Sequence, residues 1–99
     1  MMKLTDLINE ITFNTYSTMI RVTYSDISVS DLAELIRAMA GVTIVTTGSH
    51  DEYTATFEVK LVSTQDAKTA FMKLRQNMIK GIPGAKKVEI NFKGVQKLK

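Results

Sequence analysis

The chain contains no cysteine, one histidine and one proline among its 99 residues. Without cysteine there can be no disulfide bond, thiolate metal ligand or cysteine nucleophile, and this absence fits a reducing compartment. No apolar run approaches the roughly 20 residues of a membrane-spanning helix, so we expect no membrane insertion. Asp6 and Glu10 lie where a signal peptide would stay apolar, so we expect no secretion signal. These absences together predict a cytoplasmic protein.

Charge is divided unequally between the two parts of the chain. Residues 1–59 hold three basic and eight acidic residues, a net charge of −5, whereas residues 60–99 hold ten basic and two acidic residues, a net charge of +8. Such a division can steer a charged partner or set the polarity of stacked subunits. The simpler interpretation is that the lysines solvate the second helix and the last strand.

The length fits one domain with one modest core. Residues 1–17 are expected to form an amphipathic helix and a linker, and residues 18–99 the folded domain. In the first segment an apolar stripe at helical spacing comprises Leu4, Leu7, Ile8 and Ile11. A helix this short is marginal in isolation, so it needs a surface in its own domain or on a partner.

Hydrophobic periodicity divides the rest of the chain into four strands and two helices. The strands are predicted over residues 18–27, 42–47, 52–62 and 85–92. The helices are predicted over residues 28–41 and 63–81, with Ser28/Asp31 and Ser63/Asp66 at capping-box spacing. Gly41 is expected to end the first helix in a left-handed conformation.

The element order β-α-β-β-α-β predicts an α+β protein. With right-handed crossovers it resembles the ferredoxin-like fold, a four-stranded antiparallel sheet with two helices on one face. Tyr53, Phe57 and Phe92 are expected in the core. The exposed sheet face is expected to carry Arg21, Thr23, Thr54, Thr56, Glu58, Lys60, Lys87, Glu89 and Asn91, with Met19, Val45 and Val62 as its apolar members. A face without aromatic side chains does not favour the base stacking of RNA-recognition motifs.

The only histidine lies in the segment GSHDEYT, residues 48–54. His50, Asp51 and Glu52 are consecutive, so in an extended segment they point to opposite faces and cannot converge on a metal ion. Glycine, serine and aspartate are common at bends, so the segment predicts a hairpin turn. The chain has no phosphate-binding loop, dinucleotide fingerprint or nucleophile elbow. We therefore expect a non-catalytic protein without catalytic residues, metal ligands or cofactors.

Three functions remain open. The first is an interaction or assembly module that forms a homo-oligomer or docks on a protein partner through the Leu4–Ile11 stripe. The second is binding to the nucleic-acid backbone through basic residues of the second part of the chain. This set comprises Lys68, Lys73, Arg75, Lys80, Lys86, Lys87, Lys93, Lys97 and Lys99. The third is a small-ligand regulatory domain, because the element order resembles ACT domains in topology.

A further resemblance concerns the whole chain. An MKLTDLINEI-type start, a βαββαβ body and a lysine-rich end are similar to small uncharacterised proteins of tailed phages, especially marine ones. This resemblance implies a virion or accessory role, in the virion or the host cytoplasm.

Overall fold

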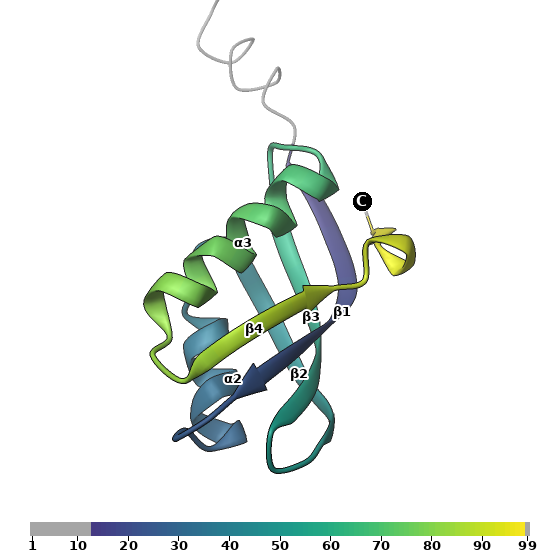
Figure 1. The fold of residues 1–99 in the computed structure, drawn as a ribbon. Coiled ribbons are helices and arrows are strands. Elements are labelled where there is room, and N and C mark those ends of the chain that lie inside the picture. The colour runs from purple at the N-terminus through teal and green to yellow at the C-terminus, as the bar shows by residue number, and fades with distance from the viewer. Residues whose placement is uncertain (1–12, 99) are drawn as a thin grey trace, which may run out of the picture.

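The computed structural model describes residues 13–98, which form an antiparallel sheet and two helices (Figure 1). The elements are, in chain order, β1 (Asn14–Tyr24), α2 (Val29–Arg37), β2 (Val42–His50), β3 (Thr54–Ser63), α3 (Ala67–Gly81), β4 (Ala85–Ile90), the single 3-10 turn η1 (Phe92–Gly94) and β5 (Gln96–Lys97). The predicted α+β class and the predicted order of the main elements are confirmed.

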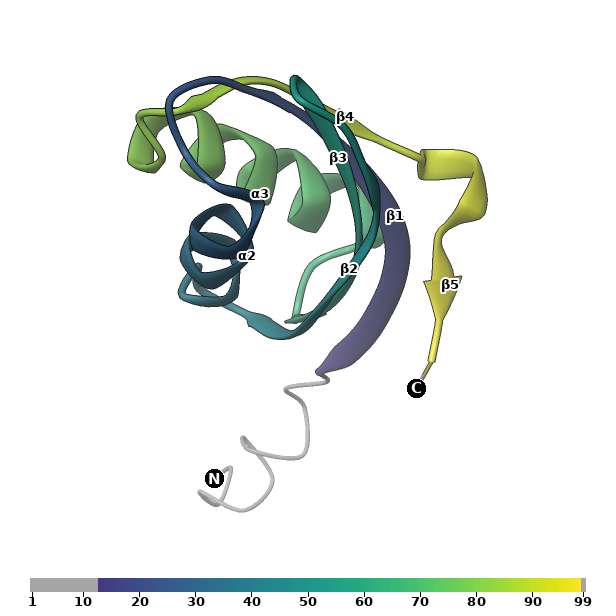
Figure 2. The same ribbon diagram turned by 90° about the horizontal axis from the view of Figure 1, so that it is seen from below.

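The sheet has the spatial order β2-β3-β1-β4, and the short β5 also pairs with β1. All of its pairings are antiparallel. Both helices cover the same, concave face, and no helix among residues 13–98 covers the opposite face (Figure 2). α2 packs mainly against β2, and α3 packs against β4 and β3. This arrangement is compatible with a ferredoxin-like fold.

β1 differs from the predicted strand at both ends. It begins at Asn14 rather than residue 18, because β3 extends far enough to pair Ser63 with Asn14. It ends at Tyr24, and the predicted strand residues 25–27 form a loop. That loop packs closely on the turn before β4, since a Cβ atom on Gly84 would lie 2.5 Å from Ile27 Cγ2.

The core lies between the helices and the concave face of the sheet. β3 alternates as predicted, with Ala55, Phe57, Val59 and Leu61 buried and the residues between them more exposed. Other buried members include Ile20 and Val22 of β1, Leu32 and Ile36 of α2, and Phe71, Leu74 and Met78 of α3.

Two aromatic residues expected in the core lie at the surface. Tyr53 is 64% exposed because it belongs to the turn before β3, where the strand alternation does not apply. Phe92 is 41% exposed because β4 ends at Ile90 and the chain turns into η1. In both cases the period-two pattern in the sequence extends beyond the actual strand.

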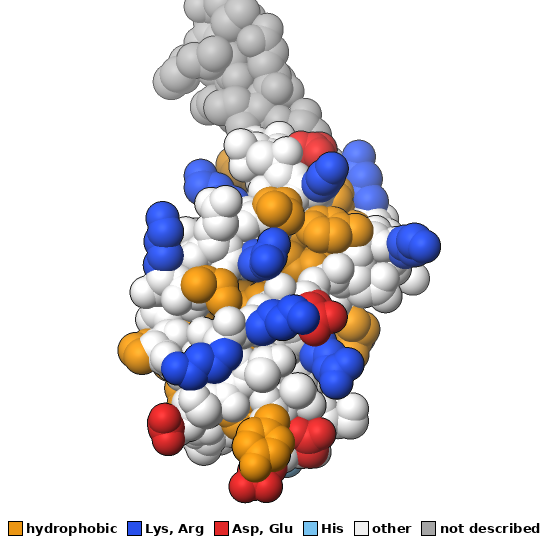
Figure 3. All heavy atoms as spheres, viewed as in Figure 1, with side chains coloured by type: hydrophobic (Ala, Val, Ile, Leu, Met, Phe, Trp, Pro, Cys, Tyr) orange, Lys and Arg blue, Asp and Glu red, His pale blue; other side chains and the backbone are white. Residues whose placement is uncertain are grey.

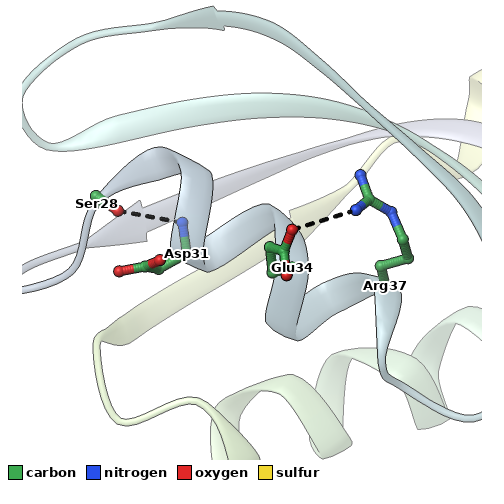
Figure 4. Close-up of polar contacts among 4 residues, drawn as sticks. All are labelled: Ser28, Asp31, Glu34 and Arg37. Atoms are coloured by element: carbon green, nitrogen blue, oxygen red, sulfur yellow. Dashed lines mark hydrogen bonds and ion pairs between the residues drawn. The ribbon is translucent and has the colours of Figure 1, made fainter.

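The start of α2 agrees with the predicted cap. The Ser28 hydroxyl accepts a hydrogen bond from the backbone N–H of Asp31 at 3.1 Å, and Glu34 pairs with Arg37 one turn later at 3.7 Å (Figure 4). The helix ends at Arg37, earlier than expected, and the chain then turns at Gly41. Gly41 has φ +83°, as predicted, and a Cβ atom there would lie 2.8 Å from the Val62 carbonyl oxygen.

The start of α3 differs from its predicted cap. Asp66 is the N-cap residue, and Ser63 still belongs to β3. The Ser63 hydroxyl instead accepts a hydrogen bond from the Gln65 N–H at 3.0 Å within the connecting turn. The capping-box spacing therefore placed the helix start three residues too early.

Two alanine substitutions test the placement of Phe57 in the core and of Tyr53 at the surface. Phe57 is fully buried, so Phe57→Ala should lower the free energy of unfolding by about 3–5 kcal/mol. Tyr53→Ala should change it by no more than about 0.5 kcal/mol, because its ring is exposed and the change keeps the backbone carbonyl that bonds Tyr24. Urea denaturation of both variants measures the difference. Equal losses would contradict this placement.

Candidate interaction surfaces

Five of the residues expected to bind a partner lie outside the described residues. They are Leu4, Leu7, Ile8 and Ile11 of the N-terminal stripe, together with Lys99. Residues 13–98 alone therefore form the surfaces that the structure describes.

β2 is an edge strand of the sheet. Among residues 13–98 it pairs only with β3, so its other edge has no neighbouring strand. Alternate N–H and C=O groups of an edge strand point away from the sheet and can pair with another chain. From Val42 to Ser49 the strand has no charged residue and no proline, and six of these residues are β-branched.

The pairing of β2 with β3 is regular only in its middle. Register shifts occur between Val42 and Ile44 and between Thr47 and His50. Ile44 to Thr47 lie between them in unbroken register with β3, and Ile44 is 47% exposed. The neutral run of β2 was visible in the sequence, but its edge position was not, because strand order depends on distant pairings.

The open face of the sheet carries the expected polar residues with one exchange. Val45 was expected there, but it is buried and faces the helices. The register shift before Ile44 reverses the strand phase, so Ile44 takes the outward position opposite Lys60, and Val45 pairs with the buried Val59. Glu89 and Lys87 form an exposed ion pair on β4 at 3.6 Å.

The basic residues are spread over the side of the molecule on which α3 and β4 lie. Figure 3 shows Lys and Arg side chains across this side, while acidic side chains gather at the end where the β2–β3 hairpin lies in Figure 1. Exposed cations on α3 are Lys68, Lys73, Arg75 and Lys80. The other exposed members of the predicted set are Lys86 and Lys87 on β4, Lys93 in η1 and Lys97 in β5.

The β2–β3 hairpin turn comprises residues 51–53, so the predicted bend lies slightly later than expected. His50 is the last residue of β2, exposed and paired with Ala55. The turn is fixed to β1, since the Tyr24 hydroxyl donates to the Asp51 carbonyl oxygen at 2.5 Å and the Tyr24 N–H donates to the Tyr53 carbonyl oxygen at 2.8 Å. An open depression of about 360 Å³ beside it is lined by Arg21, Ser49, His50, Asp51, Thr54 and Thr56.

Asp51 stabilises this turn through its carboxylate. Its Oδ1 accepts hydrogen bonds from the backbone N–H groups of Tyr53 and Thr54, both at 2.8 Å, and from the Thr54 hydroxyl at 3.1 Å. The bonds from Tyr53 and then Thr54 lower the pKa of the Asp51 carboxyl below its ordinary value of 3.8, and the positive charge of Arg21 lowers it further. The arrangement explains Asp51 as a structural residue of the hairpin.

Two kinds of feature do not occur in the part of the chain that the structure describes. Across residues 13–98, no three His, Cys, Asp or Glu side chains lie together as a metal site would require. None of the helices within that range is both long enough and apolar enough to cross a membrane.

No protein-family model and no curated protein matches this chain. The resemblance to small phage proteins therefore stays a prediction. Among solved structures the chain is similar to one described as the "Crystal structure of PH0061", with a TM-score of 0.46 and 19% sequence identity. The match covers 92% of this chain and 55% of that one, so this chain spans about half the length of that neighbour.

The hydrogen bonds to Asp51 predict a pH dependence of stability. Because the folded-state pKa is depressed, the carboxylate stabilises the fold at pH values above 3.8, and this contribution is lost as the pH falls below 3.8. Asp51→Asn keeps an acceptor oxygen but does not titrate, so its urea midpoint should fall less than that of the unmodified protein between about pH 5 and pH 2. Circular dichroism at each pH measures both midpoints.

Glu52→Gln is the matched control, since it removes the same charge at the next position. The Glu52 side chain makes no hydrogen bond to any of residues 13–98. The urea midpoint of Glu52→Gln should change with pH as that of the unmodified protein does. Parallel profiles for Asp51→Asn and the unmodified protein would show that the turn does not depend on the carboxylate.

Proposed function

We propose that this protein is a non-catalytic assembly module of ferredoxin-like fold that forms homo-oligomers through the edge strand β2. The supporting observation is the edge from Ile44 to Thr47, which has no neighbouring strand among residues 13–98. It lies in regular register with β3, and residues 42–49 around it contain no charged residue and no proline. Protein edges are usually protected from such pairing by lysine, proline, bulges or short strands.

The opposite edge of the sheet provides a comparison within the same molecule. β4 has six residues, contains the consecutive lysines Lys86 and Lys87, and is followed by the turn η1. These features disfavour pairing with another chain. β2 has nine residues and only register shifts at its ends to limit pairing. The difference favours β2 as the edge at which two copies meet.

Pairing of two β2 strands about a two-fold axis gives an antiparallel ladder. The two sheets then join into one continuous sheet, and the helices of both copies stay on the same face. Such a contact consists mainly of backbone hydrogen bonds and the Ile44 side chains, so it buries less than the roughly 1,200 Å² of a standard stable interface. We therefore expect a weak dimer whose formation depends on concentration.

Thr46→Lys tests this contact. Thr46 lies in the middle of the regular segment opposite Glu58, so a lysine there gains an opposite charge within the monomer but introduces a cation at the paired edge. Sedimentation velocity from about 10 μM to 1 mM covers the range of a weak dimer. The mass of the unmodified protein should rise from 11.1 kDa towards twice that value, whereas Thr46→Lys should remain monomeric.

Two controls separate the alternatives. Gln76→Lys adds the same charge on the outer side of α3 and should associate like the unmodified protein. Deletion of residues 1–12 removes the Leu4–Ile11 stripe and should leave association intact. If the unmodified protein stays monomeric at the highest concentration, self-association is refuted. Association lost in the deletion but kept in Thr46→Lys would assign the contact to the N-terminal segment instead.

A further inference from the structure

The cations of α3 lie on the sides of the helix that face away from the core. Ala70, Phe71, Leu74 and Met78 are buried against the sheet, whereas Lys68, Lys73, Arg75 and Lys80 are exposed. Lys86 of the adjacent β4 is exposed as well. Within residues 13–98 none of these five side chains lies in an ion pair, whereas Lys87 is paired with Glu89. The positive charges of these five side chains can therefore act on a partner.

The outer side of α3 also offers uncharged groups beside the lysines. A shallow depression of about 420 Å³ is lined by Lys68, Thr69, Met72, Lys73 and Gln76. The Gln76 amide is a group that donates hydrogen bonds to phosphate oxygens, whereas the Thr69 hydroxyl already donates to the Asp66 carboxylate. Met72 is half-buried and contributes an apolar side chain to the lining of this depression.

The length of the helix suits an extended polyanion. Lys68 and Lys80 are twelve residues apart, which corresponds to about 18 Å along a helix axis. One strand of a nucleic acid places a phosphate about every 3.4 Å of duplex, so this distance spans about five phosphates. We infer that the outer side of α3, together with Lys86, binds the phosphodiester backbone of a nucleic acid.

This inference does not depend on the proposed assembly through β2. The basic surface lies on α3 and β4, whereas β2 is the edge strand at the other end of the sheet order. Thr46→Lys should therefore bind nucleic acid even where it no longer associates. Failure of one proposal leaves the other open to its own test.

The experiment measures the binding of fluorescently labelled dT20 and of a 20-base-pair duplex by anisotropy at several salt concentrations. If each of the five cations contacts one phosphate, the slope of log Kobs against log salt should be about −3.5 for the single strand and about −4.5 for the duplex. Between 50 and 200 mM salt, affinity for the single strand should fall about 100-fold. Binding of the single strand or of the duplex with the salt slope expected for that form supports the proposal. The form that binds is thereby identified.

A pair of charge-matched double variants separates local contacts from net charge. Lys68→Glu with Lys73→Glu removes two proposed contacts, each worth about fivefold at 0.1 M salt, so affinity should fall at least about 25-fold and the slope should weaken by about 1.4. Lys93→Glu with Lys97→Glu changes the net charge equally but lies outside α3, and should cost less than about threefold. Far-UV circular dichroism checks that both variants fold.

Three results would overturn the inference. The first is no binding of either nucleic acid at about 20 mM salt, where backbone contacts are strongest. The second is binding that does not change with salt. The third is an equal loss in the two double variants, which would mean that net charge alone attracts the nucleic acid.

Discussion

Ten consecutive residue pairs join β1 to β3, from Asn14 opposite Ser63 to Thr23 opposite Thr54, and the other elements are placed relative to this ladder. A slip of one residue would move Phe57 and its neighbours from the helix side to the open side of the sheet. β4 and β5 occupy the other edge of β1, and β2 occupies the other edge of β3. The two central strands therefore determine which strands are left as edges, and hence which backbone groups can meet another chain.

The two edges of the sheet are not equivalent. β4 is short and carries two lysines before its end, whereas β2 is neutral, β-branched and regular from Ile44 to Thr47. Unprotected edges favour pairing with further strands, so natural sheets usually avoid them unless the pairing has a use. The contrast within one molecule is the physical basis on which we propose an assembly role. It requires neither a catalytic group nor a ligand.

Charge is segregated in space as well as in sequence. The turn of the β2–β3 hairpin holds Asp51 and Glu52 at one end of the molecule, and the side formed by α3 and β4 is predominantly basic (Figure 3). The exposed cations of α3 form no ion pairs within residues 13–98. Exposed ion pairs would in any case contribute little to stability. A basic surface of this kind affects the encounter with polyanions more than it affects the fold.

Local sequence determined much of the architecture. The alternation in β3, the cap at Ser28 and the positive φ of Gly41 depend on neighbouring residues, and each was predicted correctly. The errors concern features fixed by distant residues. Pairing with Asn14 keeps Ser63 in β3 and so delays α3, and the register shift in β2 exchanges the faces of Ile44 and Val45. The sequence by itself therefore determined the type and order of the elements, because periodicity and capping act over a few residues. Only the tertiary structure decided which strands form the edges of the sheet and where the cations gather, because strand pairing joins residues far apart in the chain.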